Sequence, residues 1–271
     1  MADTSPPSKG IRIFYQVFSA SASVDPKWTW YEEGSKAYIP TVARPGTEVH
    51  LTGTALRAPK MIYSKYVKYL HIEQVIENAV RAEREGYDAF VTGGMFDLGL
   101  QELREAVDIP VLGIAEACYY TACMMVQRFG VIHTDEWFVK VTGNLLKTYG
   151  IADRAVLGHH IEGWDPSSIL KGFEERPEEL IEAILKVSRE LIREGAELLI
   201  PDYAPTTIFL CQHGIREVDG VPILDNTAAL IKQTELQVDF RRMGLPKPKM
   251  GPHFALSKSE IEAARRVYGK G

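Results

Sequence analysis

Short runs of apolar, often β-branched residues alternate along the chain with stretches in which apolar residues recur at helical spacing. The apolar runs are residues 11–18, 47–53, 89–92, 109–115, 128–134, 196–205 and 221–227. Helical spacing marks residues 72–86, where Gly86 can end a helix, and also residues 100–107 and 178–195. This alternation of strand-like and helix-like segments predicts an α/β fold with parallel sheets.

Two of the helix-to-strand units are similar in sequence. Residues 84–94 (REGYDAFVTGG) align with residues 193–203 (REGAELLIPDY) at an offset of 109, and residues 109–113 align with residues 221–225 at an offset of 112. One interpretation is chance similarity between two ordinary helix-to-strand turns. The other is a duplication, which predicts two pseudo-symmetric lobes, each with a parallel sheet flanked by helices.

The duplication predicts where a ligand would bind. We expect residues 10–113 and 222–271 to form the first lobe and residues 114–221 to form the second. Ligands of open parallel sheets bind beyond the C-terminal ends of the strands, so the cleft between the lobes is the expected site. Gly94 and Tyr203 occupy equivalent positions in the repeat and should face each other across it.

Residues 24–46 fit neither the helical nor the strand period. We expect an ordered loop over the first lobe, whose aromatic side chains either pack against it or cover a ligand. Residues 1–10 lack the apolar core of a signal peptide and are expected to be a short disordered lead.

Composition and charge exclude several classes of partner. The net charge is −5, with 31 basic and 36 acidic residues and no Lys/Arg run longer than two, which argues against nucleic-acid binding. No apolar run approaches the roughly 20 residues of a membrane span, so we expect a cytoplasmic protein. Three cysteines are too few for a disulfide framework, and the adjacent His159 and His160 would point to opposite faces of a strand. No metal site and no cofactor are expected.

Residues 86–117 (GYDAFVTGGMFDLGLQELREAVDIPVLGIAEA) resemble the hydantoin racemase branch of the Asp/Glu/hydantoin racemase superfamily. The resemblance rests on Asp97–Leu100, Ile109–Val111 and Glu116–Ala117, and weaker similarity extends over roughly residues 60–230. It implies two pseudo-symmetric α/β lobes with the active site between them. It also implies one cysteine in each lobe: one thiolate removes the proton next to a carbonyl, and the opposite thiol returns a proton.

This sequence departs from that pattern at both cysteine positions. Alignment on Asp97–Leu100 puts the first at Gly94, and alignment on Gly195–Ala196 puts the second at Tyr203. Glycine cannot exchange a proton, so the two-thiol mechanism that the resemblance implies is absent. Cys118, near the start of a predicted helix, could be a nucleophile or a packing residue.

Four other residues are candidates for catalysis. Tyr203 could donate a hydrogen bond, act as an acid or base, or only fill the space beside Gly94. Asp202 could be a base or a helix cap, Glu116 could face the cleft or cap a helix, and His133 could be an acid–base group or a structural histidine. Gly93 and Gly94 could leave open space and form an anion-binding concavity. The expected substrate-binding residues are Gln16, Ser19, Thr92, Gly93, Gly94, Met95, Thr134 and Ala204.

These features favour an enzyme that acts on a small carbonyl, carboxylate or cyclic amide compound without a thiol. A hydrolase or lyase needs only one base and therefore suits the unequal pair Gly94 and Tyr203. The alternatives are a racemase or isomerase with other bases, for example Tyr203 against Cys118, and a non-catalytic ligand-binding protein. We expect a homo-oligomer whose partner is a small-molecule substrate, with neither nucleic acid nor membrane bound.

Overall fold

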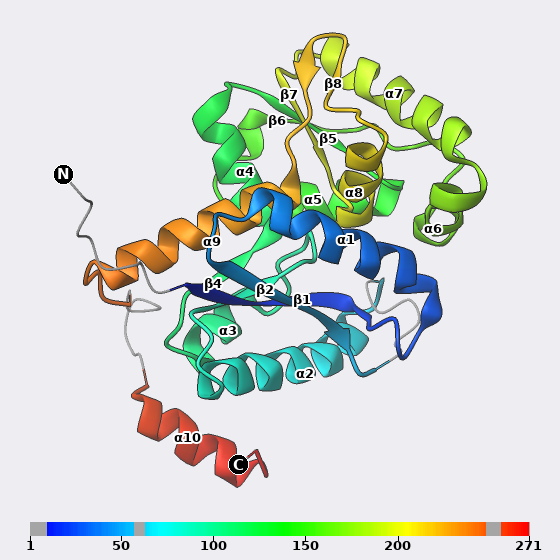
Figure 1. Cartoon of the computed structure of the whole chain (residues 1–271). Helices are drawn as coiled ribbons and strands as arrows, with labels where there is room; N and C mark the ends of the chain where they lie inside the picture. The colour runs from blue at the N-terminus through cyan, green and yellow to red at the C-terminus, as the bar shows by residue number, and fades with distance from the viewer. Residues whose placement is uncertain (1–9, 57–62, 248–255, 271) are drawn as a thin grey trace, which may run out of the picture.

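The computed structural model describes residues 10–56, 63–247 and 256–270. Within them the strands form two separate parallel sheets, in the orders β2-β1-β3-β4 and β6-β5-β7 (Figure 1). The strands of the first sheet are β1 Ile11–Ala20, β2 Thr47–Thr54, β3 Ala89–Thr92 and β4 Val111–Gly113. Those of the second sheet are β5 Phe129–Ile132, β6 Ala155–Val156 and β7 Leu198–Pro201. The prediction of an α/β fold with two lobes is confirmed.

Helices cover the sheets and connect the lobes (Figure 1). In the first lobe, α2 (Lys65–Arg84) and α3 (Leu100–Ala106) pack together and lie on the side of the sheet away from the second lobe. The chain crosses to the second lobe at α4 (Ile114–Met125), which starts directly after β4. The helices of the second lobe are α5 Glu136–Thr148, η3 Ala152–Arg154, α6 Pro166–Glu175, α7 Pro177–Arg193 and α8 Ala204–Gln212. The elements after α8 are the hairpin of β8 Glu217–Val218 and β9 Val221–Pro222, then α9 Asn226–Arg242 and α10 Lys258–Val267.

The internal repeat is visible in the strand pairing. β3 lies between β1 and β4, and β7 lies beside β5 in the corresponding place. Phe90 of β3 pairs with Val111, and Leu199 of β7 forms a parallel bridge to Ile223. Leu199 follows Phe90 by 109 residues and Ile223 follows Val111 by 112 residues, and these are the two offsets between the aligned sequences. The similarity between residues 84–94 and 193–203 therefore reflects equivalent places in the two lobes.

Residues 24–46 are helical, so the prediction of a loop was wrong. A 3₁₀ turn, η1 (Pro26–Trp28), leads into α1 (Thr29–Val42). The buried stripe of α1 has helical spacing, but it contains the polar Ser35, and Pro40 lies inside the helix, so the period is hidden in the sequence. Gly34 allows a close approach to α8, because a Cβ there would lie 3.1 Å from atoms of two α8 side chains. Packing, rather than local pattern, stabilises α1.

Three predicted strands are shorter than their apolar runs. In the run 109–115, β4 ends at Gly113 and Ile114 begins α4; in the run 196–205, β7 ends at Pro201 and Ala204 begins α8. In the run 221–227, only Val221–Pro222 is a strand, and it pairs antiparallel with β8. After β4 and β7, the apolar residues beyond the strand end form the buried first turn of the next helix, so hydrophobicity alone does not mark the change.

Helix α9 lies between the lobes (Figure 1). It contacts β3 and β4 of the first lobe, and it also packs against α4, α8 and α1. Leu230 and Ile231 in its middle are completely buried. The lobe boundaries proposed from the sequence at residues 113 and 222 stay a prediction.

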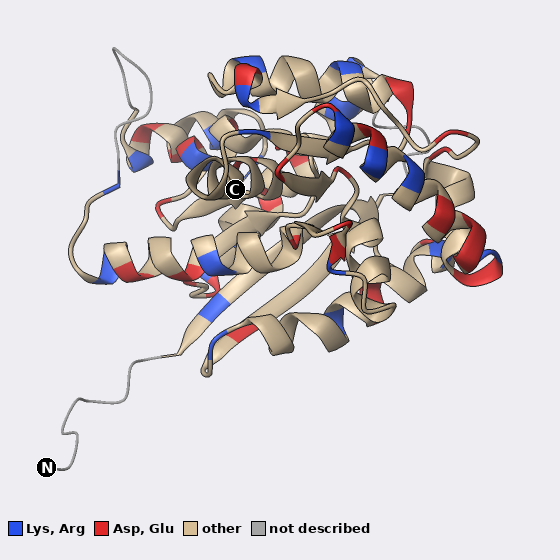
Figure 2. Cartoon of the chain, turned by 90° about the horizontal axis from the view of Figure 1, so that it is seen from above, with Lys and Arg blue, Asp and Glu red and all other residues tan. Residues whose placement is uncertain are grey.

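Acidic and basic residues are interspersed along the helices rather than separated onto opposite faces (Figure 2). Among the described residues, no helix is both long and apolar enough to cross a bilayer. The expected disordered lead, apart from Gly10, lies outside the described residues.

We expect Leu230→Ala to lower the free energy of unfolding by about 2–5 kcal/mol, because it would leave a cavity where α9 packs against other elements. The matched control is Leu236→Ala on the same helix, where the side chain is 42% exposed and the change should stay within about 0.5 kcal/mol. Urea unfolding measures both values. Equal effects of the two substitutions would contradict the role assigned to α9.

Candidate active site

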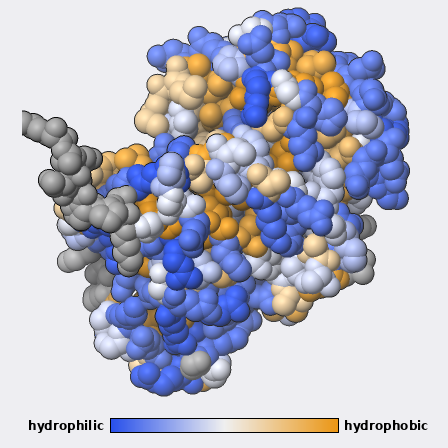
Figure 3. Space-filling view, viewed as in Figure 1, coloured by the Kyte–Doolittle hydropathy of each residue, from blue (hydrophilic) through white to orange (hydrophobic). Residues whose placement is uncertain are grey.

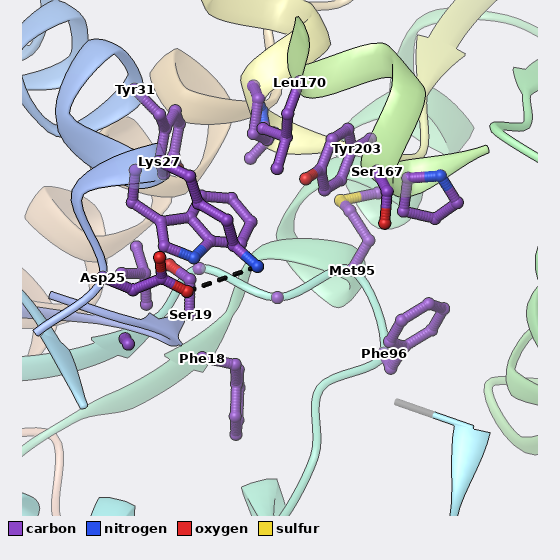
Figure 4. A pocket seen from close by; sticks show the side chains of 18 of the residues that line it. Phe18, Ser19, Asp25, Lys27, Tyr31, Met95, Phe96, Ser167, Leu170 and Tyr203 are labelled. Carbon is purple, nitrogen blue, oxygen red and sulfur yellow. Dashed lines mark ion pairs between the residues drawn. The ribbon is translucent and has the colours of Figure 1, made fainter. Parts of the chain in front are cut away.

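A cavity of about 700 Å³ lies between the lobes, where strands of both sheets end. Its lining includes the end of β1 and the turn after β3 from the first lobe and the residues that follow β7 in the second. This volume is within the range of small-molecule sites. Hydrophobic residues gather in the band between the lobes (Figure 3), and the cavity walls carry both aromatic and polar side chains (Figure 4).

Seven of the twelve residues proposed from the sequence line this cavity. They are Ser19, Gly93, Gly94, Met95, Asp202, Tyr203 and Ala204. The other five do not line it and are Gln16, Thr92, Glu116, His133 and Thr134. Gly94 and Tyr203 thus belong to the same cavity, as the internal repeat predicted, but on different walls. The catalytic and binding roles of these residues stay predictions.

The glycine turn after β3 does not leave the open space that the sequence suggested. A Cβ at Gly94 would lie 2.6 Å from Cδ2 of Phe18, and one at Gly93 would lie 2.4 Å from Cε2 of Tyr15. Aromatic rings from β1 therefore occupy the space in which a side chain at either glycine would stand. The backbone N–H groups of Gly94 and Met95 donate no hydrogen bond within the described part of the chain, so they are available to a ligand.

Tyr203 and Asp202 follow β7 on the opposite wall. Burial raises the pKa of the Tyr203 phenol well above its ordinary value, so this group stays protonated at neutral pH and can donate a hydrogen bond. Burial also raises the pKa of Asp202, although that carboxylate accepts hydrogen bonds from the backbone and hydroxyl of Thr134. Thr134 therefore orients Asp202 and does not itself reach the cavity.

Gln16 and Glu116 have structural partners away from the cavity. The Gln16 side chain is completely buried, donates to the Val17 carbonyl and accepts from Asn78. Glu116 lies in the first turn of α4 and forms an ion pair with Arg104 of α3, beside a second, smaller cavity. Since both side chains already have partners, the structure favours the helix-terminus interpretation of Glu116 over the cleft-facing one.

Thr92 and His133 are completely buried near strand ends and do not line the cavity. The Nδ1 atom of His133 lies 3.2 Å from the His159 carbonyl, while Nε2 has no partner among the described residues. Burial lowers the pKa of His133 to about 4, so the ring is neutral at pH 7. The hydroxyl of Thr92 also has no partner within the described residues.

His71 of α2 is a cavity residue that the sequence did not reveal. It is 3% exposed, and its Nε2 lies 2.9 Å from the backbone carbonyl of Phe18. A carbonyl only accepts, so Nε2 carries the proton and Nδ1 has a free lone pair. Nδ1 has no partner among the described residues. Burial lowers the pKa of His71, which keeps the ring neutral and able to accept a proton at pH 7.

The segment of η1 and α1 supplies another wall of the cavity. Asp25 and Lys27 form an ion pair of 3.3 Å there, and Trp28 and Tyr31 line the same wall (Figure 4). Asp25 is 4% exposed, so this carboxylate lies in a largely water-excluded place. Burial raises the pKa of Tyr31 to about 12. From the sequence we expected these residues in a loop, because the helical period of α1 is not visible in its pattern of apolar residues.

Aromatic contacts hold the lobes together on two sides of the cavity. On one side, Trp30 of α1 stacks on Phe173 of α6 with ring centroids 4.8 Å apart. On the other side, Phe96 after β3 packs against Trp137 and Phe138 of α5, at centroid distances of 5.5 and 5.0 Å.

None of the three cysteines lines the cavity. Cys118 is completely buried in α4, and its thiol lies 3.6 Å from the backbone carbonyl of Asn226. Burial raises its pKa further, which disfavours a reactive thiolate. Cys123 and Cys211 are partly buried elsewhere. Among the described residues, no group of three or more His, Cys, Asp or Glu side chains is arranged to hold a metal ion.

Two α/β lobes with a cavity at their strand ends define the class of protein, and comparison with known proteins gives its family. Residues 31–234 match the model of the Asp/Glu/Hydantoin racemase family, and the chain belongs to this family.

The chain is 31% identical over 231 residues to a hydantoin racemase of Pseudomonas sp. (strain NS671), covering 85% of this chain and 88% of that protein. It is 27% identical over 209 residues to a hydantoin racemase of Paenarthrobacter aurescens, covering 74% and 86%. Among solved structures, an allantoin racemase from Klebsiella pneumoniae superposes with a TM-score of 0.73 at 25% identity, covering 92% and 96%. The resemblance drawn from residues 86–117 is thereby confirmed at the level of the family.

We expect Gly94→Ala to destabilise the fold by about 1–3 kcal/mol, because the added methyl group would overlap the Phe18 ring. Phe18→Leu in the same chain should recover part of that loss. Gly143→Ala on α5, where the nearest atom is 3.7 Å away, is the matched control and should be neutral or slightly stabilising. Urea unfolding of the four variants tests this, and additive effects at positions 94 and 18 would contradict the contact.

Proposed function

We propose that this family member catalyses a cysteine-independent reaction on a small cyclic amide or carboxylate compound in the inter-lobe cavity. The observation that carries the proposal is that no cysteine lines the cavity, whereas Gly94 and Tyr203, which the resemblance to the family aligns with its two thiols, both line it. Two similar proton carriers on opposite sides are therefore missing. A hydrolase or lyase with one general base fits such unequal walls.

His71 is the best candidate for that base. It lies in the cavity wall, is neutral at pH 7 and has a buried Nδ1 atom with no partner among the described residues. Of the bases considered from the sequence, Glu116 and His133 lie outside the cavity lining. Asp202 lines it, but burial favours the protonated form of its carboxyl group. His71 also lies against Phe18, the residue whose ring occupies the space beside Gly94.

For a cyclic amide, the proposed reaction is hydrolytic ring opening. His71 accepts a proton from water while the water oxygen bonds to the carbonyl carbon. The negative charge that develops on the carbonyl oxygen is stabilised by donors, for which the Tyr203 hydroxyl and the N–H groups of Gly94 and Met95 are available. The C–N bond then breaks, and the departing nitrogen receives the proton from His71, which returns to its neutral state.

Racemisation with non-thiol groups is the second candidate, favoured by the similarity to a protein named hydantoin racemase at 31% identity. It requires proton carriers on both faces of the substrate carbon. His71 and Tyr203 would be the pair, because Cys118 is buried away from the cavity. Tyr203 would then have to lose a proton, and its raised pKa makes that step costly.

The two reactions give different products in D₂O. Incubation with a chiral 5-substituted hydantoin, followed by NMR and chiral chromatography, should show ring opening to the carbamoyl amino acid without deuterium at the α-carbon. Deuterium incorporation with loss of optical purity would support racemisation instead. Binding by calorimetry with neither product would identify a non-catalytic ligand-binding protein and overturn the proposal.

We expect a cysteine-free variant (Cys118→Ala, Cys123→Ser, Cys211→Ser) to keep kcat/KM within about threefold. His71→Gln should lower kcat by about 10²–10⁴-fold, because the amide can still donate to the Phe18 carbonyl but cannot accept the proton. In the wild-type protein, kcat/KM should fall on the acidic side, below the ordinary imidazole pKa, as His71 becomes protonated. Loss of activity in the folded cysteine-free variant would sink the thiol-independent mechanism.

A further inference from the structure

Asp97 is a buried carboxylate three residues beyond Gly94 whose hydrogen bonds the proposed chemistry does not use. Its side chain accepts from the backbone N–H groups of Ala115 and Glu116, at 3.0 and 2.7 Å, and from the Tyr149 hydroxyl at 2.5 Å. The first two donors are at the start of α4, the helix that leads into the second lobe, and Tyr149 is the C-cap of α5 within that lobe. One carboxylate therefore joins three separate segments.

The backbone around Asp97 is shaped to hold this arrangement. Asp97 has φ = +46°, a left-handed conformation that is unfavourable for a residue with a side chain. Its N–H and that of Phe96 both donate to the Gly94 carbonyl, at 3.0 and 2.7 Å, which closes the turn that lines the cavity. The carboxylate also needs Gly113 opposite, because a Cβ at that position would lie 2.1 Å from Oδ1 of Asp97.

We propose that Asp97 is a positioning residue that fixes the Gly93–Met95 turn relative to both lobes and thereby aims its free N–H groups at the substrate. It does not line the cavity, so it acts through the turn. The role of the turn in catalysis rests on the proposed function, whereas the restraint on the turn does not. Without the carboxylate, the turn would keep its two bonds to the Gly94 carbonyl and the bond from the Gly93 N–H to the Gln16 carbonyl, but it would lose those to α4 and Tyr149.

The ionisation state of Asp97 should control this restraint. Burial, followed by the charge of Glu116, raises the pKa of Asp97 to about 7, against the lowering effect of its three donors. The ionisable groups around it are Tyr149, which follows α5, and Glu116 from α4, with Arg104 paired to Glu116. Cys118 and Tyr119 lie farther along α4. The ionised carboxylate has only acceptor oxygens, so it can accept from all three donors. The protonated carboxyl group carries an O–H donor of its own and fits these donors less well. The restraint should therefore strengthen as the pH rises from 6 to 8.

The test measures hydrogen–deuterium exchange by mass spectrometry in peptides that cover residues 93–99. We expect Asp97→Gly, which removes the carboxylate but relieves the left-handed backbone, to speed exchange of this segment at least tenfold. Asp97→Asn keeps an acceptor oxygen and should give an intermediate rate that no longer depends on pH between 6 and 8. In the wild-type protein, exchange corrected for its intrinsic pH dependence should slow over that range.

A milder variant separates the restraint from general unfolding. Tyr149→Phe removes one donor to Asp97 and keeps the ring, and we expect it to speed exchange of residues 93–99 about threefold to tenfold. Tyr120→Phe is the matched control, because its hydroxyl lies 3.2 Å from the Tyr149 carbonyl and does not touch Asp97. It should leave the exchange of residues 93–99 unchanged.

Kinetics complete the test. If the turn stabilises the transition state, Asp97→Gly should lower kcat about 10–100-fold with KM within threefold, and Asp97→Asn should restore part of kcat. Wild-type-like exchange of residues 93–99 in Asp97→Gly and Tyr149→Phe would overturn the proposal. Faster exchange in these variants, with no turnover of hydantoins even by the wild-type protein, would support the restraint and reject the proposed function, so the two failures are distinguishable.

Discussion

The close packing of aromatic rings against the Gly93–Gly94 turn is the constraint on which the cavity depends. Tyr15 and Phe18 of β1 come so near to this turn that neither glycine could carry a side chain without displacement of a ring. Because interiors are packed at crystal-like density, the space beside the turn cannot serve both an aromatic ring and a thiol. The shape of this part of the first-lobe wall and the lack of a side chain at Gly93 and Gly94 therefore have one physical cause.

Burial then decides which polar groups at the cavity can act, since it opposes whichever form of a group is charged. It keeps the His71 imidazole neutral, whereas it keeps the Tyr203 phenol protonated and favours the protonated form of Asp202. The same effect makes the two walls chemically unequal, because the neutral imidazole in the first lobe can accept a proton while the phenol and carboxyl groups in the second favour their protonated forms. A pair of equivalent thiols would not show this division of roles.

The lobes meet through contacts of different kinds, and each bears on the cavity. Aromatic pairs such as Trp30 with Phe173 connect α1 to α6, α9 packs against elements of both lobes, and Asp97 connects the turn, α4 and the end of α5 by hydrogen bonds. Such contacts couple the turn at Gly94 to the relative position of the lobes. A site built between two lobes needs that coupling, because a small shift between its walls changes the distance between catalytic groups.

The sequence by itself determined the features that local pattern encodes. Strand–helix alternation predicted the fold class, and the offsets between residues 84–94 and 193–203 placed Gly94 and Tyr203 at equivalent strand ends. The tertiary structure decided the rest. His71 is 53 residues from its partner Phe18, and nothing near it in the chain marks it as a cavity residue. Packing between distant segments likewise decides three other features: helix α1, the Phe18 ring beside Gly94, and the position of Glu116 outside the cavity. A periodic pattern within one segment of the sequence cannot predict such contacts.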